Sequence, residues 1–206
     1  MWIIRSKSIV QRPRLKHRLQ LPDAEVEQDT MTNLIGANGV GKSTMLRILA
    51  GLERPHTGGV EYCSVWQRLR RLYLPCNLEF YSHATLAQNL GLFADLYGAN
   101  RFEPDVDAML YYSGLESGMR SRVDRLSDGQ RQAAALALVI IVKPDVAFID
   151  EPFAHLDATM RSFFTKRLGK LTERGTTLIC TELAPKGSAT GTGLRIQITP
   201  RTPAVI

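Results

Sequence analysis

Residues 36–44 have the residue types and the spacing of a loop that binds phosphate groups. They read Gly-Ala-Asn-Gly-Val-Gly-Lys-Ser-Thr and fit the pattern G-x-x-x-x-G-K-[ST] at every fixed position. Glycines let the backbone approach phosphate oxygens closely and turn its N–H groups toward them. Lys42 would add a positive charge at the β- and γ-phosphates, and Ser43 would give a hydroxyl ligand to Mg²⁺. We expect this phosphate loop to bind a nucleoside triphosphate through Asn38, Gly39, Val40, Gly41, Lys42, Ser43 and Thr44.

The second group of residues that could take part in a reaction is a pair of carboxylates. Asp150 and Glu151 follow the apolar run Val146–Ile149, which is typical of a buried parallel strand that ends at the carboxyl edge of a sheet. Asp150 would hold Mg²⁺ directly or through water, and Glu151 would orient and deprotonate an attacking water. An apolar run before two acids is a weak signal alone, but together with the phosphate loop it predicts phosphoryl chemistry with Glu151 as the catalytic residue and Ser43 and Asp150 at the metal.

Several elements must position these groups. An apolar pair, Leu34 and Ile35, predicts a strand that ends at the phosphate loop, and residues 45–50 predict a helix that follows it. Residues 133–142 form an apolar run that stops at Lys143-Pro144, shorter than the roughly 20 residues of a membrane-spanning helix, so we expect a buried helix. Leucine and aromatic residues recur at helical spacing between Thr85 and Gly98, which predicts a further helix that is amphipathic.

A second segment suited to phosphate binding lies just before the long apolar helix. It reads Leu126-Ser127-Asp128-Gly129-Gln130, and Ser127 can cap the helix while its neighbours expose N–H groups. The segment resembles Leu-Ser-Gly-Gly-Gln, the signature of the nucleotide-binding subunits of ABC (ATP-binding cassette) transporters. Asp150-Glu151-Pro152 resembles the acidic strand end of that family, and Ala154-His155-Leu156-Asp157 resembles its D-loop. With the phosphate loop, four ordered motifs carry the resemblance over nearly the whole chain.

The resemblance implies a fold and a set of partners. We expect a single α/β domain over residues 1–206, a P-loop NTPase core with a mostly parallel sheet flanked by helices and a helical subdomain inserted at about 77–140. In that family two subunits dimerise head to tail, so Ser127, Gly129 and Gln130 would face ATP held by a partner. ATP and Mg²⁺ are the implied cofactors. The implied partners are a second ABC ATPase subunit, identical or different, and an integral membrane permease. The chain would be a cytosolic ATP-hydrolysing subunit, peripheral on the cytoplasmic face of the membrane, and the helical segment favours an exporter.

Three positions depart from the family pattern. Glu182 stands after the predicted strand 177–181, where the family has a histidine that donates to the γ-phosphate. Cys76 stands where the family has a glutamine that reaches Mg²⁺ and the water, and Asp128 replaces the first glycine of the signature pair. A carboxylate at position 182 has the wrong charge beside a polyanion unless it is protonated or turned away. An alternative function is therefore a cassette that binds ATP and hydrolyses it slowly or not at all, as a regulatory or scaffold subunit.

Composition and charge narrow the class of protein and the kinds of partner. The chain has 206 residues, of which 44% are hydrophobic and 22% charged, as in an ordinary globular domain. Three cysteines at wide spacing match no metal-ligand pattern and favour a reducing compartment. The net charge is +6, with a basic cluster in residues 12–18, but no aromatic residues interleave with that cluster, so no nucleic acid partner is expected. A soluble ABC ATPase without a transport role is the alternative of another class, although neither a second cassette nor a coiled-coil insertion is visible.

Overall fold

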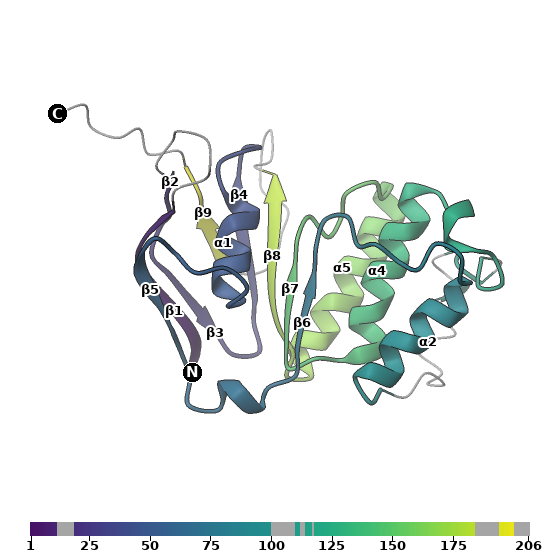
Figure 1. Cartoon of the computed structure of the whole chain (residues 1–206), viewed down its shortest axis with the longest axis horizontal. Helices are drawn as coiled ribbons and strands as arrows, with labels where there is room; N and C mark the ends of the chain where they lie inside the picture. Colours follow the sequence, from purple (N-terminus) through teal and green to yellow (C-terminus); the bar gives the residue numbers. More distant parts are fainter. Residues whose placement is uncertain (12–18, 100–109, 112–113, 117, 184–193, 200–206) are drawn as a thin grey trace.

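A five-stranded parallel sheet forms the centre of the molecule (Figure 1). The computed structural model describes residues 1–11, 19–99, 110–111, 114–116, 118–183 and 194–199, so the basic cluster at 12–18 lies outside the described residues. The strand order is β6 (Arg71–Leu74), β7 (Val146–Ile149), β8 (Thr177–Leu183), β4 (Met31–Gly36) and β9 (Leu194–Gln197). All four neighbouring pairs run parallel. The carboxyl ends of β4, β7 and β8 therefore meet at one edge, as the sequence predicts.

Side chains of the parallel strands alternate between two buried cores. In β7, Val146 and Phe148 belong to one core, while Ala147 and Ile149 belong to the other. β7 has no exposed residue, because helices or a further sheet cover both faces. This burial on both sides explains why the sequence of the strand is continuously apolar rather than alternating.

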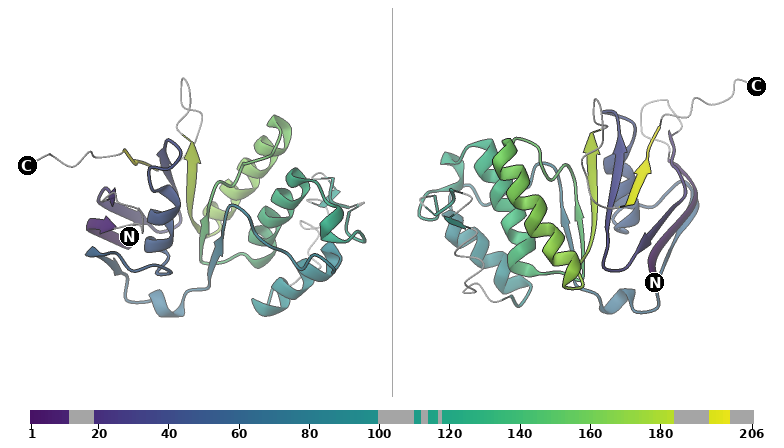
Figure 2. Two further views of the ribbon diagram at one scale, coloured as in Figure 1. Left: turned by 45° about the horizontal axis from the view of Figure 1, so that its top comes forward. Right: turned by 180° about the vertical axis from the view of Figure 1, so that it is seen from behind.

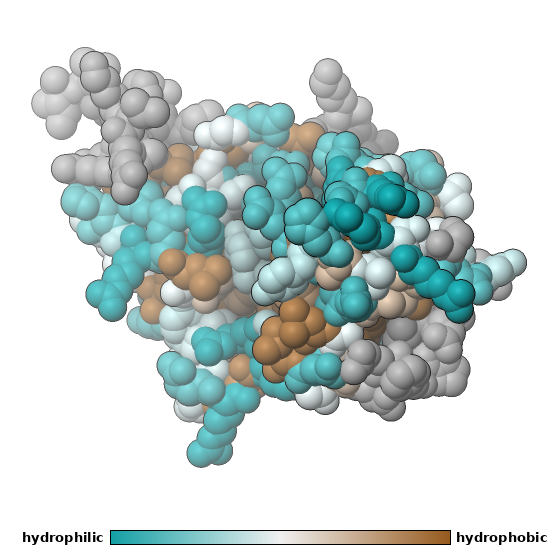
Figure 3. Space-filling view, turned by 45° about the vertical axis from the view of Figure 1, so that its right-hand side comes forward, coloured by the Kyte–Doolittle hydropathy of each residue, from teal (hydrophilic) through white to brown (hydrophobic). Residues whose placement is uncertain are grey.

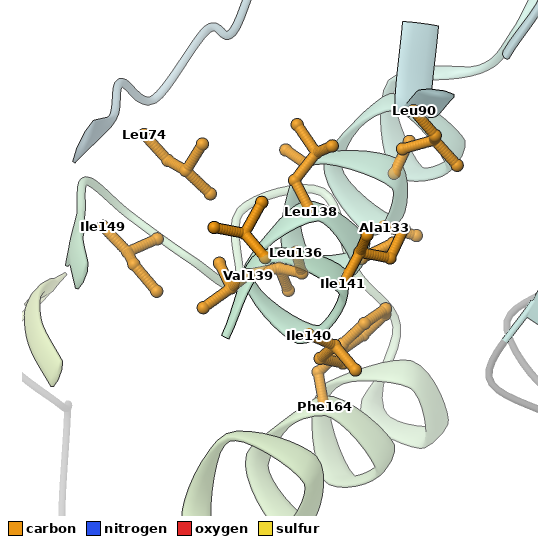
Figure 4. Packing of buried hydrophobic residues seen from close by; sticks show 14 of the residues in the cluster. Leu74, Leu90, Ala133, Leu136, Leu138, Val139, Ile140, Ile141, Ile149 and Phe164 are labelled. Carbon is orange, nitrogen blue, oxygen red and sulfur yellow. The ribbon is translucent and has the colours of Figure 1, made fainter. Parts of the chain in front are cut away.

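Helices α4 (Asp128–Val142) and α5 (Ala158–Glu173) cover one face of the parallel sheet, and α2 (Leu86–Leu96) packs against α4 (Figure 1). Figure 4 shows Leu136, Val139 and Ile140 of α4 between the strand residues Leu74 and Ile149 and Phe164 of α5. The predicted buried helix at residues 133–142 is therefore confirmed. None of the helices within the described residues is long and apolar enough to cross a membrane.

Capping side chains set the start of the helices on this face. Thr85 is the N-cap of α2: its hydroxyl accepts from the backbone N–H of Gln88, whose side chain in turn accepts from the N–H of Thr85. This reciprocal capping box satisfies two N–H groups that the first turn leaves unpaired. Gly98, at φ 62°, follows the end of the helix in the left-handed conformation. The amphipathic helix predicted between Thr85 and Gly98 is confirmed.

The other face of the parallel sheet is covered by α1 (Lys42–Leu49), which lies between this sheet and a second, antiparallel one (Figures 1 and 2). In the second sheet, β1 (Trp2–Gln11) pairs with β2 (Leu19–Gln20), β3 (Ala24–Glu27) and β5 (Thr57–Tyr62). Two short 3₁₀ helices, Trp66–Arg68 and Val123–Arg125, lie in the connections. The antiparallel sheet covers α1 on the side that faces away from α4 and α5. The first turn of α1 begins at the phosphate loop.

Candidate functional site

The phosphate loop leaves β4 at Gly36 and enters α1 at Lys42. Gly39 and Gly41 have φ angles of 77° and 103°, which residues with side chains rarely adopt. Gly36 is required for a different reason, because a Cβ atom there would lie 2.5 Å from the carbonyl oxygen of Ile198. Ala37, Asn38 and Gly39 are exposed, so the backbone of the loop is open to a ligand. The local sequence thus builds a backbone cradle at the N-terminus of a helix, where an anion is favoured.

Lys42 places its ammonium inside this loop. The side chain is only 5% exposed, and Nζ donates to the carbonyl oxygens of Gly36 at 3.1 Å and Ala37 at 2.9 Å. A buried lysine is costly unless its charge is partnered, and here two carbonyl dipoles provide partners. The positive charge is therefore held within the phosphate loop.

The end of β7 meets the start of α1 and the end of β8 at one carboxylate. Ser43 Oγ donates to Asp150 Oδ1 at 3.1 Å, and Thr181 Oγ1 donates to the same oxygen at 2.6 Å. Asp150 is 6% exposed, and Thr181 is fully buried. The hydroxyl of Ser43 and the carboxylate of Asp150 are the hard oxygen ligands that Mg²⁺ prefers. The described residues contain no cluster of three or more His, Cys, Asp and Glu side chains suited to a metal.

Glu151 is held through its backbone on both sides. Its φ is 49°, an unusual conformation for a residue with a side chain. Its N–H donates to Thr181 Oγ1 at 2.7 Å, and its carbonyl oxygen accepts from Gln132 Nε2 at 3.3 Å. Gln132 Nε2 also donates to the carbonyl of Pro152 at 2.8 Å. Two side chains from other elements thus fix the turn that presents the Glu151 carboxylate.

The Cys76 thiol contacts the carboxylate of Glu151. The distance from Sγ to Oε2 is 3.7 Å, within the range of a hydrogen bond to sulfur. Burial raises the pKa of the Cys76 thiol, and the negative charges of Glu151 and Asp150 raise it further. The thiol therefore remains protonated at neutral pH and can donate to the carboxylate. The cysteine, which is shorter than the glutamine the family pattern leads one to expect, reaches Glu151 directly.

The signature segment caps α4. Ser127 accepts from the N–H of Gln130, and the Gln130 side chain accepts from the N–H of Ser127, which confirms the predicted cap. Asp128 is paired with Arg131, so its negative charge is partly neutralised. Gly129 packs against the D-loop, since a Cβ atom there would lie 2.9 Å from the carbonyl oxygen of His155.

Glu182 lies beside a cation. Arg161 Nη2 of α5 is 3.7 Å from Glu182 Oε1, and the Glu182 side chain is 21% exposed. A cavity of about 460 Å³ is lined by these two residues together with Ile35, Glu151, Thr181 and Arg195. Ile35 directly precedes the phosphate loop, so the cavity adjoins the site where phosphate is expected. The Arg161 guanidinium reduces the repulsion that a lone carboxylate would exert there.

The predicted site residues thus fall into two groups. The residues of the phosphate loop are brought together with Asp150, and Glu151 follows Asp150 at the same sheet edge. Ser127, Gly129 and Gln130 lie at the start of α4, and α1 and α4 cover opposite faces of the parallel sheet (Figure 1). The roles of these residues in binding and catalysis stay predictions. Sequence reasoning missed Thr181, Gln132 and Arg161, although a threonine at the end of a strand parallel to the acidic one was a usable signal.

Comparison with known proteins identifies related sequences. The sequence profile of the family described as "ABC transporter" matches residues 19–154. The chain is 34% identical, over 155 residues, to the Fe(3+) ions import ATP-binding protein FbpC of Escherichia coli, an alignment that covers 71% of this chain and 44% of the relative. It is 33% identical to a sulfate/thiosulfate import ATP-binding protein CysA of Chlorella vulgaris, over 66% of this chain and 61% of the relative. The chain spans about half the length of the curated relatives it matches.

Solved structures support the same grouping at the level of the fold. The ATP-binding subunit of an ABC transporter superposes with a TM-score of 0.71 at 24% sequence identity. The alignment covers 87% of this chain and 79% of the other. The expected P-loop NTPase core, with a parallel sheet flanked by helices, is therefore confirmed.

Proposed function

This chain belongs to the ABC transporter family, and we propose that it binds ATP with Mg²⁺, hydrolyses it, and thereby drives a separate membrane permease. The observation that carries this proposal is the convergence of Ser43, Asp150 and Thr181 at one oxygen, next to the cradle that contains Lys42. A hydroxyl, a carboxylate and a lysine in this arrangement fit a nucleotide polyphosphate and its cation.

Each part of the site has one task in this proposal. The loop amides and Lys42 would bind and orient the phosphates, and Ser43 and Asp150 would hold Mg²⁺. Mg²⁺ bound there would neutralise charge on the phosphate oxygens. Glu151 orients a water and accepts its proton, and its fixed backbone keeps the carboxylate in position. Positioning and charge stabilisation are the main requirements of phosphoryl transfer, since the protein supplies little covalent chemistry.

The proposed partners are a second ABC ATPase subunit and permease subunits at the cytoplasmic face of a membrane. Ser127, Gly129 and Gln130 would face ATP held by the second subunit. The permease would contact the side that carries α2, where Leu92 and Leu96 are 40% and 69% exposed. Figure 3 turns this side of the molecule forward and shows apolar patches among hydrophilic side chains. The two relatives described above are import proteins by name, so they do not support the exporter prediction, and the direction of transport stays a prediction.

A second candidate function is a cassette that binds ATP but turns it over slowly. The residues that favour it are Glu182 and Cys76, where the family pattern has histidine and glutamine. The Arg161–Glu182 pair supports the first candidate instead, because the guanidinium reduces the repulsion between Glu182 and a bound phosphate. The two candidates differ only in turnover, not in ATP binding.

Steady-state phosphate release separates the candidates. The complex is purified from detergent-solubilised membranes through a tag on this chain, beside a matched Glu151→Gln variant. We expect Mg²⁺-dependent release by the wild type and a loss of at least about 100-fold in the variant, the size of effect seen when a positioned general base is removed. Binding without release would support the slow cassette. Release that persists unchanged in Glu151→Gln would contradict the role of Glu151.

A further inference from the structure

We propose that Thr181 is a positioning residue whose hydroxyl sets the Asp150 carboxylate and the Glu151 backbone in the arrangement needed for Mg²⁺ and the attacking water. The proposal rests on the function proposed above and assigns a residue that none of the four sequence motifs contains. Thr181 lies near the carboxyl end of β8, and β8 and β6 are the two neighbours of β7 in the sheet.

The geometry at Thr181 is that of a bridge. Its Oγ1 donates to Asp150 Oδ1 at 2.6 Å and accepts from the N–H of Glu151 at 2.7 Å. The Thr181 side chain is 0% exposed, so its hydrogen bonds are shielded from bulk solvent. The register of the two parallel strands places Ile149, the last residue of β7, beside Cys180 of β8. Asp150 follows β7 directly, and Thr181 is the next residue of β8. The bridge is thus a direct product of the strand pairing.

A hydroxyl is suited to this bridge because it donates and accepts at the same time. Thr181 uses its one proton on Asp150 and a lone pair on the Glu151 N–H. Ser43 donates to the same Oδ1 of Asp150, so two hydroxyls from different elements fix the orientation of this carboxylate. Valine has the same shape as threonine but would leave the Asp150 oxygen and the Glu151 N–H each without this partner.

A second buried threonine provides a matched control. Thr32 lies on the neighbouring strand β4, is also 0% exposed, and has a hydroxyl with no hydrogen-bond partner among the described residues. Thr32→Val therefore makes the same change of a buried hydroxyl to a methyl group without breaking a bond. Any effect of Thr181→Val beyond that of Thr32→Val reports the bridge rather than the insertion of an apolar group.

The test measures nucleotide binding as well as turnover. The affinity for a fluorescent ATP analogue is titrated against Mg²⁺ concentration, and again in EDTA, for the wild type and for Thr181→Val, Thr181→Ser and Thr32→Val. We expect Thr181→Val to raise the Mg²⁺ concentration of half-maximal effect about 10- to 100-fold, as loss of a residue that orients a metal ligand does, while affinity in EDTA is unchanged. Thr181→Ser should restore the wild-type value, and Thr32→Val should match it.

Two results would overturn the proposal: an unchanged Mg²⁺ dependence in Thr181→Val, or an equal loss of affinity in EDTA and in Mg²⁺, which marks a purely structural role. If the valine variant does not fold, Thr181→Cys carries the test, because it keeps the volume with a weaker hydrogen-bonding group. Turnover of the wild type decides the proposed function separately. A wild type without turnover would refute hydrolysis while its Mg²⁺ dependence of binding still tests Thr181.

Discussion

Gly129 lies against the D-loop at the start of α4, with no room for a larger residue. It is the second residue of α4, and a Cβ atom there would lie 2.9 Å from the backbone carbonyl oxygen of His155. Because that oxygen belongs to the backbone, Gly129→Ala must move the D-loop or the start of α4. Overpacking of this kind costs about 1–3 kcal/mol.

Gly169 provides the reference for this change. It lies inside α5, where a Cβ atom would have no neighbour within 4 Å. Gly169→Ala should stabilise the protein by about 0.5–1 kcal/mol, because alanine loses less conformational freedom than glycine on forming a helix. Both variants make the same chemical change within a helix, so the difference between them isolates the contact with His155.

Thermal unfolding of the purified protein, followed by circular dichroism, measures this difference. For a chain of this size 1 kcal/mol shifts Tm by about 2–4 °C, so we expect Gly129→Ala to unfold about 2–12 °C below Gly169→Ala. Equal melting temperatures, or a higher one for Gly129→Ala, would refute the close approach of the signature segment to the D-loop.

Two further predictions concern charges near Glu151 and Glu182. Glu151→Gln should speed alkylation of Cys76 by N-ethylmaleimide at neutral pH, because removing a negative charge lowers the raised pKa of that thiol and increases its thiolate fraction. Peptide mass spectrometry measures the alkylation rate of Cys76, with Cys63 as internal reference. An unchanged rate at Cys76 would contradict the contact between Cys76 and Glu151. Glu182→Gln should raise the affinity for Mg·ATP, and Arg161→Met should lower it. Neither variant should change Tm much, because an ion pair at 3.7 Å between partly exposed side chains contributes at most about 1 kcal/mol to stability. Affinity shifts of the same sign in both variants would contradict this charge argument.

The elements around the motifs were predictable because their signals are local in sequence. The phosphate loop, the apolar run before Asp150 and the cap at Ser127 are each read from a few consecutive residues, and the structure has a strand or helix at each expected place. The alternation of the two cores across β7 also follows from its continuous apolar sequence.

Contacts between distant residues were not predictable in this way. The hydroxyl of Thr181 meets Asp150 across 31 positions, and Gln132 meets Pro152 across 20, so only the strand order and the helix packing bring them together. Strand β5 of the antiparallel sheet escaped prediction for a different reason. It begins Thr57-Gly58-Gly59 and has no buried residue, so it lacks both the composition and the alternation by which strands are recognised.

Calorimetric titration of Mg·ATP into the purified chain tests whether residues 36–44 form a site for ATP. We expect saturable binding of one nucleotide per chain, and loss of that binding in Lys42→Met, which removes the ammonium that lies beside Gly36 and Ala37. Thermal unfolding of the same variant shows that it is folded. The absence of binding by the wild type, or equal binding by folded Lys42→Met, would show that the loop is not an ATP site.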